Sequence, residues 1–160
     1  MIEAKIFSLV IVPEAGQYLV TLEEKNGTRL LPIWIGPAEG MAIAAALHGQ
    51  DFPRPLTHDL LTNILKELQV GIEKIVITDL KNDTFYANIL LKVDSRAYTI
   101  DSRPSDSIAV AVRVSAPIFI EEKVFEKCPA IHKPITKEEV ERFKKDIEHL
   151  RPEDFFKKTK

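Results

Sequence analysis

One stretch sets the architecture of this chain: Ile100-Asp101-Ser102-Arg103-Pro104-Ser105-Asp106-Ser107-Ile108-Ala109-Val110-Ala111-Val112-Arg113. It begins at the end of an alternating, strand-like run, and after Arg103-Pro104 it becomes an almost wholly apolar segment whose second half has to be buried. A binding or catalytic site on a rigid helix or strand typically has charged side chains at its entrance and an apolar segment that fixes their position. We therefore expect a strand, a turn and a buried helix here, with a candidate site where they meet.

The flanking sequence predicts two groups of strands joined by hairpins. Six segments read as strands, namely residues 2–12, 17–25, 28–35, 72–80, 84–93 and 96–100. Asn26-Gly27 is a strong hairpin signal, because a type I′ turn needs positive φ at both of its central positions. The last three segments follow one another through short turns, which predicts an antiparallel meander. A further short strand is expected at residues 117–120.

Three other segments predict helices. The first begins at Pro37 and is rich in alanine over residues 41–47, so it can approach a sheet or another subunit closely. Thr57 is expected to cap the second helix, and a capping box formed by Thr136 and Glu139 opens the third. Two of these helices carry apolar stripes: Leu60, Leu61, Ile64, Leu65 and Leu68 in the second, and Val140, Phe143, Ile147 and Leu150 in the third.

These elements predict an α+β fold, in which a mostly antiparallel sheet of hairpins and a meander packs with two to three helices. A chain of 160 residues can bury a core without disulfide or metal support. The composition becomes dense in charge after Lys133. We therefore expect a domain over residues 1–130 and a charged helical extension over residues 131–160, which ends in a frayed basic tail after Pro152.

Composition restricts the possible partners and the compartment. The net charge is −2, and residues 133–160 contribute +2 from nine basic and seven acidic side chains, which leaves −4 for residues 1–132. A body with this charge binds nucleic acid poorly without a local basic groove. The single cysteine, Cys128, excludes an internal disulfide. The first apolar run is too short for a signal core or a membrane span, so we expect a cytoplasmic protein without a membrane partner.

The central stretch offers the strongest candidate site residues. If Asp101 ends a strand and Asp106 lies in the first turn of a helix, both carboxylates can face one pocket and, with water and a phosphate oxygen, hold Mg²⁺. Arg103 can then bind a phosphate beside the helix N-terminus. The alternative is purely structural: Asp106 and Ser105 cap the helix, and Arg103 pairs with a neighbouring acid.

The same two interpretations, a functional site and a purely structural role, apply to Glu39, His58, Asp59 and Arg54. Glu39 lies in the first turn of a helix, where a carboxylate favours the dipole, and it becomes part of a site only if it faces Asp101 and Asp106. His58 can act as a general base or as a ligand, or it can be an exposed residue in a first helical turn. Nothing matches a Walker loop, GxGxxG, GxSxG or HExxH pattern, so ATP, dinucleotide and zinc-protease chemistry have no support.

Three stretches together resemble the bifunctional nuclease domain family, and they stand in that family's order and spacing. They are residues 31–43 (Leu-Pro-Ile-Trp-Ile-Gly-Pro-Ala-Glu-Gly-Met-Ala-Ile), residues 54–61 (Arg-Pro-Leu-Thr-His-Asp-Leu-Leu) and residues 101–113 with their Arg-Pro-Ser-Asp core. The likeness covers about residues 1–130. Gly40 and Ser107 stand where alanine is usual in the family.

The resemblance implies a nuclease that acts on DNA, RNA or both. On this hypothesis Glu39, Asp101 and Asp106 hold Mg²⁺ or Mn²⁺, and Asp101, Arg103, Asp106 and His58 form the catalytic set. Arg54 and Asp59 then contact the substrate. Two alternatives remain open: a protein-interaction or regulatory module without enzymatic activity, and a domain that binds small anions. Self-association is expected through the alanine-rich face and the charged C-terminal helix.

Overall fold

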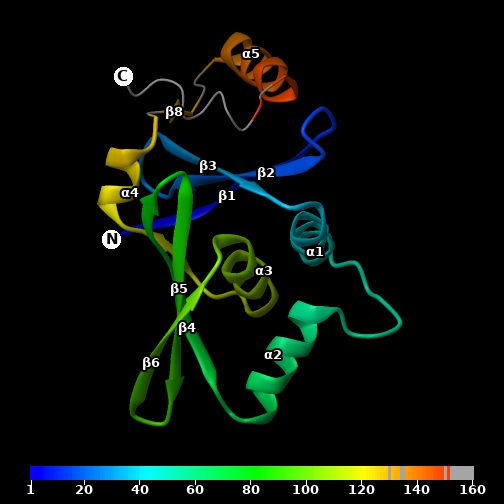
Figure 1. Cartoon of the computed structure of the whole chain (residues 1–160), viewed down its shortest axis with the longest axis vertical. Coiled ribbons are helices and arrows are strands. Elements are labelled where there is room, and N and C mark those ends of the chain that lie inside the picture. The colour runs from blue at the N-terminus through cyan, green and yellow to red at the C-terminus, as the bar shows by residue number, and fades with distance from the viewer. Residues whose placement is uncertain (130, 134–135, 150, 152–160) are drawn as a thin grey trace.

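The computed structural model describes residues 1–129, 131–133, 136–149 and 151 (Figure 1). In these residues eight strands form one sheet, and five helices accompany it. The strands are β1 (Ile2–Val12), β2 (Gln17–Glu24), β3 (Arg29–Ile35), β4 (Gly71–Lys81), β5 (Thr84–Val93), β6 (Arg96–Ser102), β7 (Ile118–Ile120) and β8 (Ile131–His132). The helices are α1 (Pro37–Leu47), α2 (Thr57–Glu67), α3 (Pro104–Val114), α4 (Glu122–Lys127) and α5 (Lys137–Glu148).

The strand order is β6-β5-β4-β7-β1-β2-β3-β8, and every pair is antiparallel except β4 with β7. The predicted hairpins and the meander are therefore confirmed, as is the α+β class. The three residues of β7 join the two groups of strands, because Ile120 lies opposite Ile2 of β1 on one side and beside Ile77 of β4 on the other. Two short elements, α4 and β8, were not predicted from the sequence.

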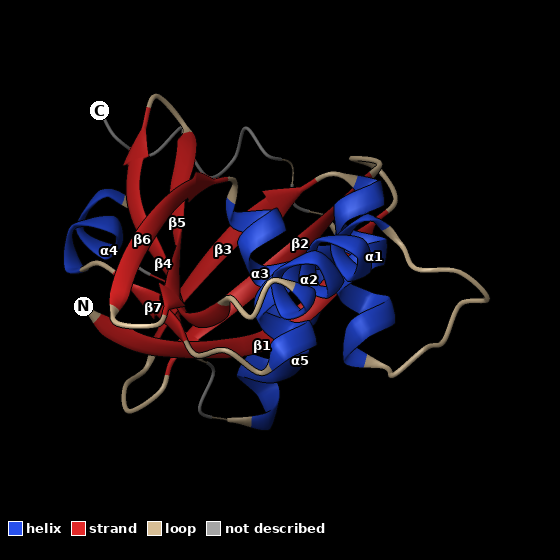
Figure 2. Ribbon diagram, turned by 90° about the horizontal axis from the view of Figure 1, so that it is seen from below, coloured by secondary structure: helices blue, strands red, loops and turns tan. Residues whose placement is uncertain are grey.

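Helix α3 occupies the centre of the molecule, with α1 and α2 beside it (Figure 2). Residues Ile108–Ala111 are fully or almost fully buried, as the sequence predicts. Ile108, Ala109 and Ala111 pack against the sheet in one continuous core that includes buried isoleucines of α1 and β4, namely Ile43, Ile75 and Ile77. The position of α3 is therefore fixed by packing along its length, and its first turn is held in place at the edge of that core.

The alanine-rich face of α1 is used inside the molecule. Ala42 and Ala45 are buried, and α1 packs closely on α3. Gly40 lies under the ring of Tyr18, so that a Cβ atom at this position would come within about 2.2 Å of the ring carbon Cγ. This contact explains why glycine stands where the family resemblance leads us to expect alanine.

Helix α2 forms where it is predicted, but its beginning and its exposure differ from expectation. Leu56 is the N-cap and Thr57 is the first helical residue, because Leu56 keeps an extended backbone and donates its N–H to Asp59 Oδ2 at 2.8 Å. None of the residues of α2 is buried. Its apolar stripe, which a helix usually turns toward a core, is largely exposed.

Helix α5 begins with the predicted capping box, in which Glu139 N–H donates to Thr136 Oγ1 and Thr136 N–H donates to Glu139 Oε2. Phe143 meets Phe7 of β1 edge to face, with ring centroids 6.2 Å apart. The side chain of Ile147, Leu150 and the predicted tail after Pro152 lie outside the described residues. No helix within the described ranges has the length and apolar character needed to cross a membrane.

Candidate functional site

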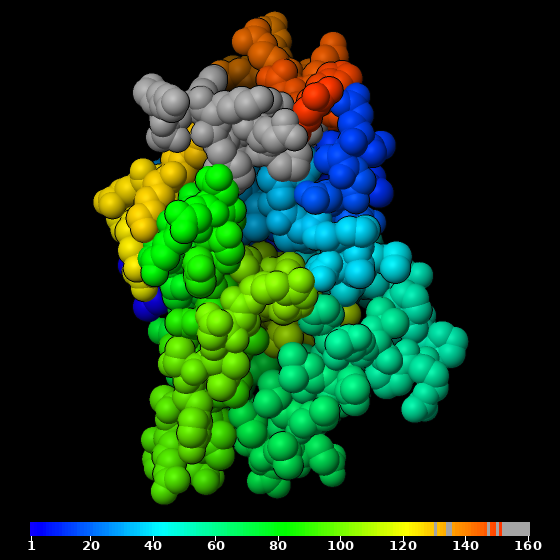
Figure 3. Space-filling model, viewed as in Figure 1, coloured from blue at the N-terminus to red at the C-terminus, as the bar shows by residue number. Residues whose placement is uncertain are grey.

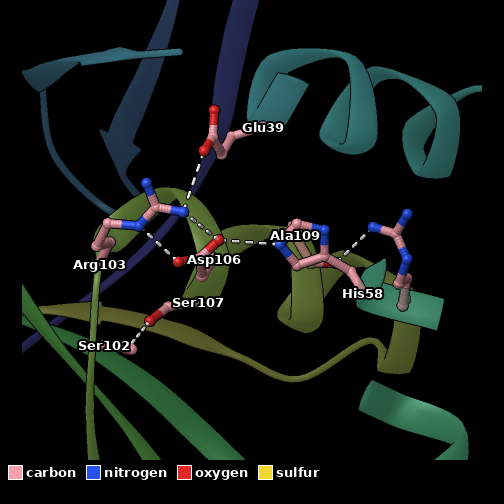
Figure 4. A network of polar contacts seen from close by, with 8 residues as sticks. Glu39, His58, Ser102, Arg103, Asp106, Ser107 and Ala109 are labelled. Atoms are coloured by element: carbon pink, nitrogen blue, oxygen red, sulfur yellow. Dashed lines mark hydrogen bonds and ion pairs between the residues drawn. The ribbon is translucent and has the colours of Figure 1, made fainter. Parts of the chain in front are cut away.

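A network of charged side chains forms where the first turns of α1 and α3 meet (Figure 4). Pro37 and Pro104 each stand in the first turn of their helix, which places Glu39 and Asp106 in first turns as well. Arg103, the N-cap residue of α3, lies between the two carboxylates. Its Nε donates to Asp106 Oδ2 at 2.7 Å, and its Nη2 lies 3.1 Å from Asp106 Oδ1 and 3.0 Å from Glu39 Oε1.

His58 joins this network from the first turn of α2. Its Nε2 lies 3.0 Å from Asp106 Oδ1, and its side chain is only 12% exposed. Because an ionised carboxylate can only accept, we assign the hydrogen of this contact to Nε2. Nδ1 makes no hydrogen bond within the described part of the chain. The arrangement resembles the carboxylate–histidine pairs that orient a general base.

The carboxyl of Asp106 is held in its charged form. Partial burial raises its pKa, but hydrogen bonds from Arg103 and His58 more than offset this effect, so the net pKa lies below the ordinary value. The same contact with Asp106, helped by Glu39, raises the pKa of Arg103. At neutral pH the centre of the network is therefore one cation between two carboxyl groups.

A second ion pair anchors α2 beside this network. Arg113 Nε donates to Asp59 Oδ1 at 2.6 Å, and Arg113 Nη1 donates to the carbonyl oxygen of Ala109 at 2.9 Å. The hydrogen bond from Arg113, together with the one from Leu56 N–H, lowers the pKa of Asp59. Asp59 thus fixes the turn that carries His58, and its expected contact with a substrate stays a prediction.

Two serines connect the end of β6 with the start of α3. Ser102 at the end of β6 and Ser107 in α3 share a hydrogen bond between their hydroxyl groups, and Ser102 also donates to the carbonyl oxygen of Ala87 at 3.3 Å. Ser107 is fully buried. Ser102 precedes Arg103 in the sequence and Ser107 follows it, so this contact joins the end of β6 to α3 across the turn that carries Arg103.

The structure brings four predicted site residues together, Glu39, His58, Arg103 and Asp106, with Asp59 beside them. It does not bring Asp101 to them. The side chain of Ser102 points toward α3, and side chains alternate along a strand, so Asp101 lies on the opposite face of the sheet, where it is exposed. Arg54 is exposed on the loop before α2 and makes no hydrogen bond or ion pair with other described residues.

The donor set does not fit a resident divalent ion in this arrangement. Among the described residues, no three His, Cys, Asp or Glu side chains are grouped closely enough to hold a metal. The guanidinium of Arg103 lies between Glu39 and Asp106 and contacts both carboxylate oxygens of Asp106 and Oε1 of Glu39. Asp101, the third predicted ligand, is on the other face of the sheet.

Sequence reasoning missed the roles of Arg113, Ser102 and Ser107. Arg113 is the single charged residue in an otherwise apolar half-helix, and its side chain is only 9% exposed. A charge inside a segment that must be buried needs a partner. That signal was present in the sequence, although it does not identify Asp59 as the partner.

Comparison with protein families shows that the model of the bifunctional nuclease domain matches residues 20–133. Two uncharacterised proteins of Mycobacterium tuberculosis, from strains CDC 1551 / Oshkosh and ATCC 25618 / H37Rv, are each 35% identical over 162 residues. Each alignment covers 96% of this chain and 97% of the relative.

Plant proteins are more distant relatives. Bifunctional nuclease 1 of Oryza sativa subsp. indica is 26% identical over 114 residues, which are 69% of this chain and 34% of the plant protein. Bifunctional nuclease 1 of Arabidopsis thaliana is 27% identical over 105 residues, which are 63% of this chain and 32% of that protein. The chain therefore corresponds to about a third of each plant nuclease.

Proposed function

Because the chain belongs to the bifunctional nuclease domain family, we propose that it hydrolyses phosphodiester bonds of DNA, RNA or both at the network of Glu39, His58, Arg103 and Asp106. The observation that carries this proposal is the pairing of His58 with Asp106 directly beside Arg103. A proton acceptor and a phosphate-binding cation then share one carboxylate. The proposed location of the enzyme is the cytoplasm, in keeping with the single cysteine, Cys128, which is free.

In this proposal, Arg103 binds the phosphate. Its side chain is 65% exposed, and its Nη1 makes no hydrogen bond within the described ranges. Nη1 can therefore donate to a non-bridging oxygen of the substrate while Nε and Nη2 stay on Asp106 and Glu39. Glu39 and Asp106 fix the plane of the guanidinium, which reduces the rearrangement needed when charge develops on the phosphate.

In this proposal, His58 activates water. In the proposed step, Nδ1 of His58 takes a proton from a water molecule while the water oxygen forms a bond to phosphorus. The bond between phosphorus and the leaving ester oxygen breaks, and that oxygen takes a proton from solvent. His58 then returns its proton to solvent. The products are a phosphate monoester and a free hydroxyl group, and Asp106 keeps the ring oriented throughout.

The activity is tested with the purified full chain on plasmid DNA and single-stranded RNA. We expect cleavage by the wild type, loss of cleavage in His58→Asn, and unchanged cleavage in His48→Asn, a control at an exposed histidine that follows α1. Cleavage that survives in His58→Asn would contradict the site. The absence of cleavage of either substrate, with or without added Mg²⁺ or Mn²⁺, would contradict the activity itself.

The expected Mg²⁺ or Mn²⁺ remains a prediction, and no step above uses an ion. The same assay tests it, because cleavage that requires added Mg²⁺ or Mn²⁺ and stops with EDTA would support it. Cleavage that continues in EDTA would support the metal-free arrangement. Metal-dependent cleavage that is lost in Asp101→Asn would restore Asp101 to the site.

A second candidate is an interaction module, and the observation that favours it is the exposed apolar face of α2. The expected homo-oligomer belongs to this proposal, although the alanine face of α1 is used internally. A chain that cleaves nothing but gains thermal stability from phosphate esters would support the third alternative, a domain that binds small anions.

A further inference from the structure

A cavity of about 230 Å³ lies where the ends of α1 and α3 meet the loop that leads to α2. Figure 3 shows this loop at the surface of the molecule, between α1 and α2. Small side chains at the end of α1 leave the space, and four larger ones line it: Asp51 and Phe52 of the loop, Asp59 of α2 and Arg113 of α3. We call this cavity the loop pocket.

Arg113 brings a nitrogen atom without a partner to the loop pocket. Its side chain is only 9% exposed, so more than nine-tenths of it is buried. Nε donates to Asp59 and Nη1 to the carbonyl oxygen of Ala109, but Nη2 makes no hydrogen bond with any described residue. Nη2 is also not sealed from solvent. Arg113 therefore offers a donor in a fixed position to a ligand that brings an acceptor into the pocket.

The charges around the loop pocket favour a neutral ligand. One guanidinium, that of Arg113, faces two carboxylates, those of Asp51 and Asp59, and the C-terminal ends of α1 and α3 add partial negative charge. An anion is therefore repelled. Within the described ranges the two carboxylates also belong to no cluster that could hold a metal ion. A neutral molecule with both donors and acceptors matches this lining.

Phe52 gives the pocket an aromatic face, since its side chain is 39% exposed and lines the cavity. Unpaired nucleobases stack on such rings while their edges form hydrogen bonds. The cavity is smaller than the roughly 300–1,000 Å³ of pockets that enclose a drug-sized ligand, so it fits one ring system and not a whole nucleotide. Guanine presents one acceptor, O6, beside two donors, N1–H and N2–H, which matches one guanidinium and two carboxylates.

We propose that the loop pocket binds an unpaired guanine base of the polynucleotide that this chain cleaves, an inference that rests on the proposed function. The pocket is close to the candidate site, because His58 and Asp59 are neighbours in the first turn of α2. Asp106 and Arg113 stand seven residues apart on α3, so they lie on one face of the helix and roughly 10 Å apart along its axis. A base beside the cleaved bond can thus enter the pocket while its phosphate contacts Arg103.

The test measures binding without cleavage. The full chain is titrated with guanosine, adenosine, cytidine, uridine and inorganic phosphate, and the NMR signals of the backbone amides of Gln50 and Phe52 are followed. We expect guanosine to shift these signals and to bind about tenfold more tightly than the other nucleosides. Phe52→Ala should weaken guanosine binding about tenfold. Leu47→Ala is the matched control, because Leu47 is 44% exposed but does not line the pocket, and it should bind guanosine as the wild type does.

Equal binding of the four nucleosides, or binding of none, would overturn the proposal. Unchanged guanosine binding in Phe52→Ala, or the same signals shifted by inorganic phosphate, would overturn it as well. If Phe52→Ala does not fold, Ala46→Leu takes its place, because it puts a larger side chain into the pocket and should also weaken binding. Guanosine binding by a chain that cleaves no RNA would support the pocket and remove the activity, and RNA cleavage by a chain that binds no guanosine would do the reverse.

Discussion

Arg113 Nε lies 2.6 Å from Asp59 Oδ1, so the last turn of α3 is tied to the first turn of α2. We expect Arg113→Met to lower the free energy of unfolding by about 1–3 kcal/mol, because the nearly buried ion pair is lost and Asp59 keeps its charge without this partner. Urea unfolding measures the change. In a double-mutant cycle with Asp59→Asn, the two effects should not be additive. Additive effects would show that the contact contributes nothing.

Acid should destabilise the fold through its paired carboxylates. The pKa values of Asp59 and Asp106 lie below their ordinary values, and the hydrogen bond from Lys127, with Lys81 and Lys123 nearby, lowers that of Asp79 as well. A lowered pKa in the folded state adds stability that is present above the unfolded value, about pH 4, and is lost as pH falls through the folded value.

We therefore expect the urea midpoint to fall from about pH 5 toward pH 2, and to fall less steeply in Asp79→Asn than in the wild type. Midpoints measured at a series of pH values in one buffer of constant ionic strength give the slope. A midpoint that stays constant or rises on acidification would contradict the assignment of these ion pairs.

Gly40 should not accept a side chain. We expect Gly40→Ala to lower the free energy of unfolding by about 1–3 kcal/mol, because the new Cβ atom would overlap the ring of Tyr18 in a buried contact. Gly71→Ala is the control, since a Cβ atom there would meet only the carbonyl oxygen of Lys92 at an ordinary 3.6 Å. Equal stability losses in both variants would mean that the close contact with Tyr18 is not the cause.

The two serines under the site should respond unequally to substitution. Ser102→Ala leaves the hydroxyl of Ser107 buried without this partner, and we expect a loss of about 1–3 kcal/mol. Ser107→Ala leaves Ser102 its hydrogen bond to Ala87 and places a small apolar group in an apolar site, so its effect should be under about 1 kcal/mol. Thermal unfolding of both variants decides the order, and a larger loss in Ser107→Ala would reverse this account of the pair.

The guanidinium of Arg103 should be needed for activity and not for folding. Lysine keeps the charge but cannot contact Asp106 through two nitrogen atoms while it also reaches Glu39. We expect Arg103→Lys to reduce cleavage about a hundredfold with little change in Tm, because the side chain is largely exposed. The measurement is kcat/KM on single-stranded RNA beside thermal unfolding. Full activity in this variant would remove Arg103 from the proposed mechanism.

Local signals predicted most of the fold, and non-local contacts account for what they missed. Asn26-Gly27 and the alternating runs identified the hairpins, because turn chemistry and side-chain period act over a few residues. The place of β7 between β1 and β4 could not be predicted, since three residues carry no information about distant partners. Similarly, the stripe of α2 predicts an amphipathic helix but does not say what covers it.

In the candidate site, too, local signals were predictable from the sequence and non-local contacts were not. The first-turn positions of Glu39 and Asp106 were readable from Pro37 and Pro104, and their shared contact with Arg103 depends on the packing of α1 against α3. Asp101 was placed with them because it was expected to end the strand that leads into the helix of Asp106. A shift of one residue along a strand moves a side chain to the other face of the sheet, and the sequence spacing did not determine which face Asp101 occupies.

Helix α2 carries His58 at one end and the apolar stripe along its exposed side, whereas Arg103 and Asp106 belong to a helix with seven buried residues. The proposed base is therefore carried by a helix without a buried residue, and the proposed cation by the start of a mostly buried helix. A partner that binds α2 therefore acts on the helix that carries the imidazole, and not on the helix that begins at the guanidinium. By reciprocity, if a partner on α2 changes the position of the imidazole, a polynucleotide that holds both groups changes the affinity for that partner by the same factor.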